Sequence, residues 1–320
     1  MLRVLRRLLP LLCLLGWAMP AAAQDYPVRP LRMIVPFPAG AGPDLVARLV
    51  AEHLRENLGQ PVVIDNRPGA LGSIGALEIA RAPPDGHTLG IITNSTHASN
   101  VSMFRRLAYD PINDFALIGR AITTAMVLLV RPEFPAQTFP AFLEYARRNP
   151  NTISGGYGSG AAQMSLARLR TAGGVLAEPV PYRGVPLAVA DVIQGSLTFS
   201  LADYAISLQQ MQGNVLRGLA VTAATRSELM PDLPAMAEFL PGFDVTIWYG
   251  FAAPARTPQP IVDRLASLVS GYFSMPSTRR RMAEIGLSTA PQNPAEFQDF
   301  IRAEIVKWTA AAREAGIEPQ

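Results

Sequence analysis

Cysteine is almost absent from the 320 residues of this chain. The only one, Cys13, lies in the N-terminal segment, so the rest of the chain has no disulfide, thiol nucleophile or cysteine-based metal site. Lysine is equally scarce, and Lys307 is the only one. The three histidines, His53, His87 and His97, are not spaced as metal ligands usually are. These absences argue against Schiff-base, thiol and metal-dependent catalysis. We therefore expect no catalytic residues, no metal and no cofactor.

An excess of one charge is also missing once the N-terminal segment is set aside. The chain has 28 basic and 25 acidic residues. Three of the basic residues, Arg3, Arg6 and Arg7, lie within the first 23 positions, which contain no acidic residue. The remaining chain is therefore balanced, and no nucleic-acid partner is expected because the basic surface that such binding needs is absent.

No apolar run after residue 23 is long enough to cross a membrane. The apolar run Leu8–Trp17 follows the three arginines and is itself too short to span a bilayer. Small residues at Ala21–Ala23 come next, and this order is typical of a secretory signal peptide. The sequence predicts a signal peptide over residues 1–23, with the mature protein in the periplasm and no stable membrane insertion. An uncleaved membrane anchor is the alternative.

Short β-rich runs alternate with amphipathic helical patterns in the first part of the mature chain. Strands are expected at Leu31–Val35, Val62–Ile64 and Thr88–Ile92, and helices at Pro43–Leu58 and Ser73–Ala82. Pro43 suits a first helical turn. This alternation predicts a parallel sheet with helices on its faces.

The alternation begins again further along and indicates a second α/β unit. Expected strands are Ala125–Val130, Thr152–Ser154, Val180, Leu197–Leu201, Arg217–Thr222 and Val245–Phe251. Expected helices are Pro140–Arg148, Ala161–Thr171, Pro186–Gln194, Pro260–Phe273, Ser277–Ile285 and Pro294–Ala315. We expect an α/β protein with a discontinuous domain 1 (residues 24–124 plus 245–320) and a domain 2 (residues 125–244), between which the chain crosses twice.

Three loops that follow strands are candidate ligand sites. Pro36–Asp44 joins a strand end to a helix start, where free backbone N–H groups and the helix dipole favour an anion. Gly155–Gly160 holds the same position in the second unit, with Ser159 as a hydroxyl donor. Thr93–His97 is a run of polar side chains. Each loop could equally be an ordinary turn or helix cap, but a candidate in each half predicts a cleft that grips a ligand from both sides.

Several long motifs in the chain resemble a known family. Tyr26–Gly40 (YPVRPLRMIVPFPAG), Leu58–Ala70 (LGQPVVIDNRPGA) and Pro84–Leu89 (PDGHTL) are similar to Bug-type solute receptors, which are associated with tripartite tricarboxylate transporters. Further matches are Tyr109–Pro111, Val180–Gly184, Leu219–Thr222, Pro231–Pro234 and Trp248–Gly250. The resemblance covers nearly the whole mature chain. It implies a two-domain type II periplasmic-binding-protein fold with a central ligand cleft.

The same resemblance implies a function and partners. The protein would be a periplasmic receptor, not an enzyme, that captures a small carboxylate: a di- or tricarboxylate, an acidic amino acid or an aromatic acid. It would contact membrane transporter subunits transiently, and we expect a monomer. Backbone N–H groups and ordered water of the first two loops would hold the ligand carboxylate, which maps the site onto Phe37–Asp44 and Tyr157–Gln163. Within the first loop, Asp44 is expected to cap N–H groups and point away from the ligand.

Four residues outside those two loops complete the expected site. Thr93 and Asn94 offer neutral donors, Arg183 follows a short strand and could face the cleft as a counter-ion, and Asp203 lies beside the later pocket. A solvent-exposed position is the alternative for Arg183. The expected ligand-binding residues are Phe37, Ala39, Gly40, Ala41, Gly42, Asp44, Thr93, Asn94, Tyr157, Gly158, Ser159, Gly160, Gln163, Arg183 and Asp203.

The chain departs from the family pattern at the site itself. Gly40-Ala41 stands where paired glycines are common, and Ala161-Ala162, followed by Ser165, stands where the family often has Gly-Ser and then a histidine. Ala202 replaces a common aspartate, with Asp203 adjacent. These departures leave the identity of the carboxylate open.

A Rossmann-type NAD-dependent oxidoreductase is the alternative function. Gly40–Leu45 follows a strand and opens a helix, and Asp65 ends the next strand, as in a dinucleotide fingerprint. Leu45 occupies the third glycine position, however, where close helix–strand packing needs a small residue. Export would also separate the protein from the cytosolic cofactor pool.

Overall fold

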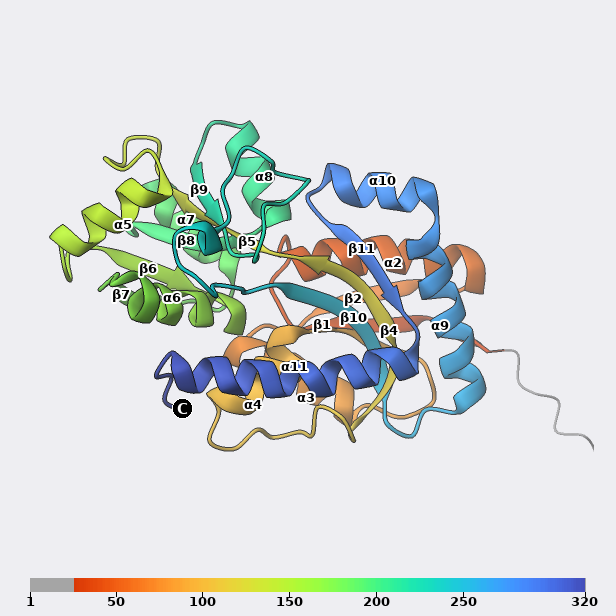
Figure 1. The fold of residues 1–320 in the computed structure, drawn as a ribbon. Coiled ribbons are helices and arrows are strands. Elements are labelled where there is room, and N and C mark those ends of the chain that lie inside the picture. The colour runs from red at the N-terminus through yellow and green to blue at the C-terminus, as the bar shows by residue number, and fades with distance from the viewer. Residues whose placement is uncertain (1–25, 320) are drawn as a thin grey trace, which may run out of the picture.

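Two α/β lobes make up the computed structural model, which describes residues 26–319 (Figure 1). The first lobe is a six-stranded sheet with its helices, and the second lobe is a five-stranded sheet with its helices. The predicted signal peptide lies outside the described residues. Within residues 26–319, no helix combines the length and apolarity that crossing a membrane would need.

The sheet of the first lobe is mixed. Its strands are β1 (Leu31–Val35), β2 (Val62–Asn66), β3 (Thr88–Thr93), β4 (Phe115–Thr124), β10 (Ile247–Pro254) and β11 (Ser288–Gln292), in the order β11-β4-β10-β3-β1-β2. β1 pairs in parallel with β2 and β3, whereas β10 is antiparallel to β3 and β4, and β11 to β4. The three strands predicted to form a parallel sheet do pair in parallel, and β10 adds antiparallel pairing because it re-enters from the other lobe in the opposite direction.

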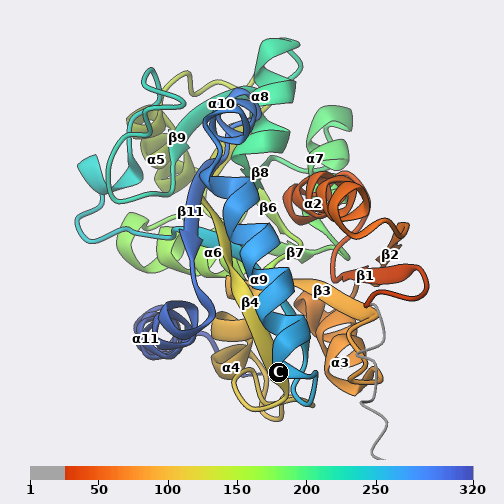
Figure 2. The same cartoon turned by 90° about the vertical axis from the view of Figure 1, so that its right-hand side faces the viewer.

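Helices cover both faces of this sheet. α2 (Gly42–Leu58) and α9 (Gln259–Ser274) pack on one face, and α3 (Ser73–Arg81), α4 (Asn100–Met103) and α11 (Pro294–Glu314) lie on the other (Figure 2). α10 (Pro276–Glu284) packs against α9 and β11. Because α2 begins directly after the loop that leaves β1, its first turn faces the second lobe.

The second lobe repeats the layered arrangement with a smaller sheet. Its strands are β5 (Met126–Val130), β6 (Ser154–Tyr157), β7 (Glu178–Pro181), β8 (Phe199–Asp203) and β9 (Arg217–Val221), in the order β7-β6-β8-β5-β9. Its helices are α5 (Phe139–Arg148), α6 (Gly160–Gly173), α7 (Val185–Gln194) and α8 (Tyr204–Gln212). Alternate residues of β5 face two different apolar clusters, as strand geometry requires.

One buried threonine ties together the two places where the chain crosses between lobes. The first crossing runs from β4 into β5 at Ala125, and the return lies between β9 and β10. The Thr222 hydroxyl accepts a hydrogen bond from the Met126 N–H at 3.0 Å and donates one to the Val245 carbonyl at 2.8 Å. Backbone hydrogen bonds from Thr222 N to Met126 O and from Val245 N to Thr222 O complete the junction. The two crossings therefore form one hydrogen-bonded unit.

Sequence patterns missed or displaced several elements. β4, β11 and α8 were not predicted, and the strand expected at Thr152–Ser154 starts at Ser154 as β6. The run from Gly155 was read as a loop because glycine is rare in strands. Here the glycines are required by packing, since a Cβ on Gly155 would lie 2.6 Å from Leu166 Cδ2 and one on Gly156 would lie 2.4 Å from Leu197 Cδ2.

A buried carboxylate fixes α11 to the first lobe. Glu304 Oε2 accepts hydrogen bonds from the indole N–H groups of Trp248 and Trp308, both at 2.9 Å. Trp248 lies on β10 next to Tyr249, and its ring packs edge-on against Phe297 of α11. The C-terminal end of α11 then extends beneath α6 of the second lobe (Figure 1).

We predict that Glu304→Ala lowers the free energy of unfolding by about 2–5 kcal/mol, because it leaves two buried indole donors without an acceptor. Glu304→Gln keeps an acceptor oxygen and should retain most of the stability. Urea denaturation followed by tryptophan fluorescence measures both variants. Equal unfolding midpoints for Glu304→Ala and the wild type would contradict the assignment.

Candidate functional site

A small cavity lies between the two lobes. It is bordered by the ends of β1, β3 and β8, the starts of α2, α6 and α7, and the first half of β10. Its lining residues are Phe37, Ala41, Pro43, Thr93, Asn94, Ser95, Ser159, Ala161, Val185, Asp203, Ile247 and Tyr249. Ligands of α/β sheets bind at such strand ends, so this cavity is the candidate site.

The structure brings only part of the expected site to this cavity. The expected residues that line it are Phe37, Ala41, Thr93, Asn94, Ser159 and Asp203. Gly42 and Gly160 are buried in the contact between lobes and Gly158 is buried against Gly184 within the second lobe, whereas Ala39 and Gly40 are exposed. Proximity in sequence to a ligand loop therefore does not place every residue of that loop against the cavity.

Two other expected residues line a different cavity. Tyr157 and Gln163 face a space under the C-terminal segment, which they share with Arg170 and residues 315–318. Arg183 is exposed and lines neither cavity, so its solvent-exposed alternative describes the structure. Tyr157 was expected in a loop beside the ligand, but it is the last residue of strand β6 and therefore faces a different cavity.

The first loop is held from behind by Asp44. Its carboxylate accepts hydrogen bonds from the Gly40 N–H at 2.9 Å, from Asn66 Nδ2 at 2.9 Å and from Arg48 Nε at 2.9 Å. Burial raises the pKa of Asp44, but these hydrogen bonds outweigh it and leave the pKa below its ordinary value. Asp44 thus points away from the cavity, and its charge is already paired.

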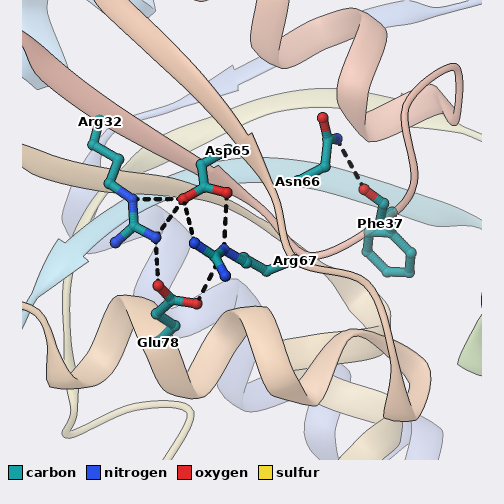
Figure 3. A network of polar contacts seen from close by, with 6 residues as sticks. All are labelled: Arg32, Phe37, Asp65, Asn66, Arg67 and Glu78. Carbon is teal, nitrogen blue, oxygen red and sulfur yellow. Dashed lines mark hydrogen bonds and ion pairs between the residues drawn. The ribbon is translucent and has the colours of Figure 1, made fainter.

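A polar network beyond Asn66 supports the same loop (Figure 3). Asn66 Nδ2 also donates to the Phe37 carbonyl at 3.0 Å. Next to it, Asp65 accepts hydrogen bonds from Arg32 and Arg67, and Glu78 of α3 pairs with both arginines. These contacts join β1, β2 and α3, so the loop that carries Phe37 leaves a fixed edge of the sheet.

The polar run after β3 is buried, which corrects its prediction as a loop. Ser95–Ser99 forms a π-helical turn that continues into α4. The Thr96 hydroxyl accepts from the Thr93 N–H at 3.0 Å, and the Tyr109 hydroxyl donates to the Thr96 carbonyl at 2.6 Å. Burial lowers the pKa of His97 to about 3, so this imidazole is neutral at physiological pH. The turn thereby presents Asn94 and Ser95 to the cavity in fixed positions.

The lobes meet at glycines that allow close approach. The Gly160 N–H, at the start of α6, donates to Ser95 Oγ across the cleft at 3.1 Å. A Cβ on Gly184 would lie 2.4 Å from Cγ of Pro38 in the first loop. A Cβ on Gly42 would lie 2.6 Å from both Asp203 Oδ2 and the Tyr249 hydroxyl. Any larger side chain at these positions would hold the lobes apart or displace the lining.

Two buried polar groups of the lining have no hydrogen-bond partner among the described residues. They are Asn94 Nδ2 and the Tyr249 hydroxyl; Asn94 and Tyr249 are each 2% exposed. An unpaired buried polar group costs about 1–3 kcal/mol, so such groups are rare unless something binds them. Asn94 can donate to an anion, and Tyr249 can both donate and accept.

Asp203 is the only charged side chain that lines the cavity. Burial raises the pKa of its carboxyl to about 6, and the nearby Tyr249 hydroxyl and Gly42 N–H offset part of that rise. The Tyr249 hydroxyl lies beside the Asp203 carboxylate, but the two do not meet in hydrogen-bonding geometry. Among residues 26–319, no three histidine, aspartate or glutamate side chains gather closely enough to hold a metal ion. The cavity thus offers neutral donors and one carboxyl group.

Sequence reasoning missed half of the lining. Tyr249 lies in the Trp248–Gly250 motif and Ser95 in the polar run Thr93–His97, but neither was among the expected ligand-binding residues. Val185 and Ile247 gave no signal, because an apolar residue at an element start reads as ordinary core. The nearest signal was positional, since Ile247 and Tyr249 lie where the chain returns to the first lobe.

Comparison with known proteins identifies close relatives in sequence. The model of the tripartite tricarboxylate transporter family receptor (TctC) matches residues 46–317. A Pseudomonas sp. (strain P51) protein, described as UPF0065 protein in tcbD-tcbE intergenic region, is 33% identical over 88% of this chain and 85% of its own length. Protein BugT of Bordetella pertussis is 31% identical over 94% of each chain.

Solved structures agree with this relationship. R. palustris Rpa4515 with adipate superposes with a TM-score of 0.90 at 33% identity, covering 92% of this chain and 100% of its own. The periplasmic binding protein BugD gives 0.88 at 32% identity, covering 92% and 100%. MatC from Rhodopseudomonas palustris with bound malate gives 0.83 at 29% identity, covering 89% and 99%.

These matches confirm the predicted periplasmic-binding-protein fold, here built on two mixed sheets. They also decide against the oxidoreductase alternative, because the matching family consists of solute receptors and not of enzymes. The chain belongs to the Bug/TctC family of periplasmic solute-binding receptors of tripartite tricarboxylate transporters.

Proposed function

We propose that the interlobe cavity binds a small carboxylate, which the protein delivers to a tripartite tricarboxylate-type transporter. The observation that carries this proposal is the pair of unpartnered polar groups, Asn94 Nδ2 and the Tyr249 hydroxyl, in the cavity lining. A carboxylate has the acceptor oxygens that Asn94 Nδ2 needs, and the Tyr249 hydroxyl can bond another polar atom of the same ligand. Relatives support the class, since one was solved with adipate and another with malate.

The ligand carboxylate would be bound without a cation. No lysine or arginine lines the cavity, but the first turns of α2 and α6 border it and their helix dipoles favour an anion. Ser159 caps α6 by accepting from the Ala162 N–H at 3.2 Å, and its hydroxyl hydrogen stays free to donate. Neutral donors from both lobes would therefore share the charge.

We propose a clamshell in which residues 24–124 with 245–320 and residues 125–244 close on the ligand. The Thr222 junction would act as the hinge, because it ties the two chain crossings between the lobes together. Closure then depends on contacts made only in the closed state. Export by a signal peptide over residues 1–23 would place this receptor in the periplasm as a monomer that meets its transporter transiently.

The test is a thermal-shift screen of residues 24–320 against mono-, di- and tricarboxylates, with NAD in the same plate. Ligand at one hundred times its dissociation constant stabilises the native state by about 2.7 kcal/mol, so a binding acid should raise the melting temperature by several degrees. A shift with NAD and with none of the acids would overturn the proposed function.

Closure itself is tested by Gly184→Ala, whose Cβ would meet the rigid ring of Pro38 across the cleft. We expect the dissociation constant of the acid identified in the screen to rise about tenfold or more, equivalent to about 1.4 kcal/mol, with little change in unfolding stability. Isothermal titration calorimetry gives the affinity.

Gly271→Ala is the matched control, because Gly271 is exposed on α9 and a Cβ there would meet nothing within 4 Å. It should bind like the wild type. Undiminished affinity in Gly184→Ala would show that binding does not need this contact between lobes.

A further inference from the structure

We infer that Asp203 makes the cavity selective for carboxylates that carry a second, hydrogen-bond-donating group, an ammonium or a hydroxyl, and that it disfavours dicarboxylates. The inference rests on the proposed function and specifies its substrate class. It starts from the charge inventory of the lining, in which the single charged side chain is an acid.

Among residues 26–319, no lysine or arginine lines the cavity to neutralise Asp203. Arg48, on the helix that borders the cavity, is paired with Asp44, and Arg183 is exposed away from the cavity. Asp203 itself is 7% exposed. A second ligand carboxylate placed beside it would put two like charges in a poorly solvated space, which is strongly unfavourable.

The surroundings of Asp203 are otherwise neutral. Gly42 approaches from α2, Tyr249 from β10, and Met126 pairs with Asp203 from β5. Tyr204, which begins α8, lines a different crevice, close to the first chain crossing. Within the described part of the chain, Tyr249 is therefore the only titratable side chain that faces the carboxyl. Burial together with Asp203 holds the pKa of Tyr249 well above the ordinary value.

A ligand with a hydrogen-bond donor at this end of the cavity would satisfy Asp203 without adding a second negative charge. An ammonium or hydroxyl beside Asp203 would donate to its carboxylate, and the Tyr249 hydroxyl, which has no partner in the described structure, could accept or donate at the same end of the cavity. The ligand carboxylate would remain with the neutral donors of the helix starts and Asn94. One molecule with both groups would satisfy the acid and the unpaired donors together.

The protonation of Asp203 gives the two ligand classes opposite pH dependences. Burial raises the pKa of this carboxyl to about 6. A dicarboxylate binds best to the neutral form, so its affinity should rise as pH falls from 7.5 towards 6. An amino acid binds best to the ionised form, so its affinity should fall over the same range.

The experiment compares acids that share a skeleton and differ in the distal group. The sets are 4-aminobutyrate, 4-hydroxybutyrate, succinate and butyrate; 6-aminohexanoate, 6-hydroxyhexanoate, adipate and hexanoate; and 4-hydroxybenzoate, terephthalate and benzoate. Calorimetry at pH 7.5 should give the best donor-bearing acid a dissociation constant about tenfold or more below that of the dicarboxylate of its set.

Asp203→Asn should remove or reverse this preference, because it deletes the charge and adds an amide donor of similar shape. In the wild type, we expect dicarboxylate affinity to rise about tenfold between pH 7.5 and 6, and Asp203→Asn should remove this rise. A rise that persists in the variant would come from protonation of the ligand instead of Asp203. Tyr249→Phe is the matched control, since it removes a hydroxyl from the same end of the cavity without changing the charge. It should weaken binding but keep the preference for donor-bearing acids.

Two outcomes would overturn the inference while leaving the proposed function intact. One is a dicarboxylate that binds the wild type at pH 7.5 as tightly as the donor-bearing acid of its set. The other is an unchanged preference in folded Asp203→Asn. Binding of no acid to either folded protein would overturn the proposed function, and this inference with it. The pH dependence of the wild type needs no variant, so a misfolded Asp203→Asn would still leave the inference testable.

Discussion

The close approach of the two lobes at glycine positions is the constraint on which the site depends. Gly160 brings its N–H within hydrogen-bonding distance of Ser95, and Gly184 lets the second lobe reach Pro38. These contacts bury the space between the lobes and with it Asn94 Nδ2 and the Tyr249 hydroxyl, which find no hydrogen-bond partner among residues 26–319. Closure thereby turns polar side chains that would be unremarkable in an open cleft into groups that require a ligand.

Both halves of the cleft are held by internal polar contacts, which leaves the cavity groups free. Asp44 and Asn66 hold the first loop from behind, and the Thr96 and Tyr109 contacts hold the turn after β3. The two crossings converge on Thr222. The charged residues near the site therefore serve the scaffold, with Asp203 as the exception. Because the other charged groups are paired within the scaffold, the site can bind an anion with neutral donors, and Asp203 alone can discriminate between one anion and another.

The sequence predicted the fold class and family but only part of the site. Strong periodicity and end signals located β1 and α2 to within a residue, because burial and local geometry agree there. β6 was misplaced because its glycines serve packing against Leu166 and Leu197, a requirement that appears only in three dimensions. The antiparallel pairing of β10 and the apolar lining residues Val185 and Ile247 depend on the return of the chain from the second lobe, which no local pattern encodes.

The central claim is that a ligand supplies the hydrogen bonds that Asn94 and Tyr249 lack in the closed cleft. A crystal structure of residues 24–320 with the tightest-binding acid tests it most directly. The account predicts polar ligand atoms within about 3.2 Å of both Asn94 Nδ2 and the Tyr249 hydroxyl. A ligand bound elsewhere, such as beneath the C-terminal segment beside Gln163 and Arg170, would contradict it.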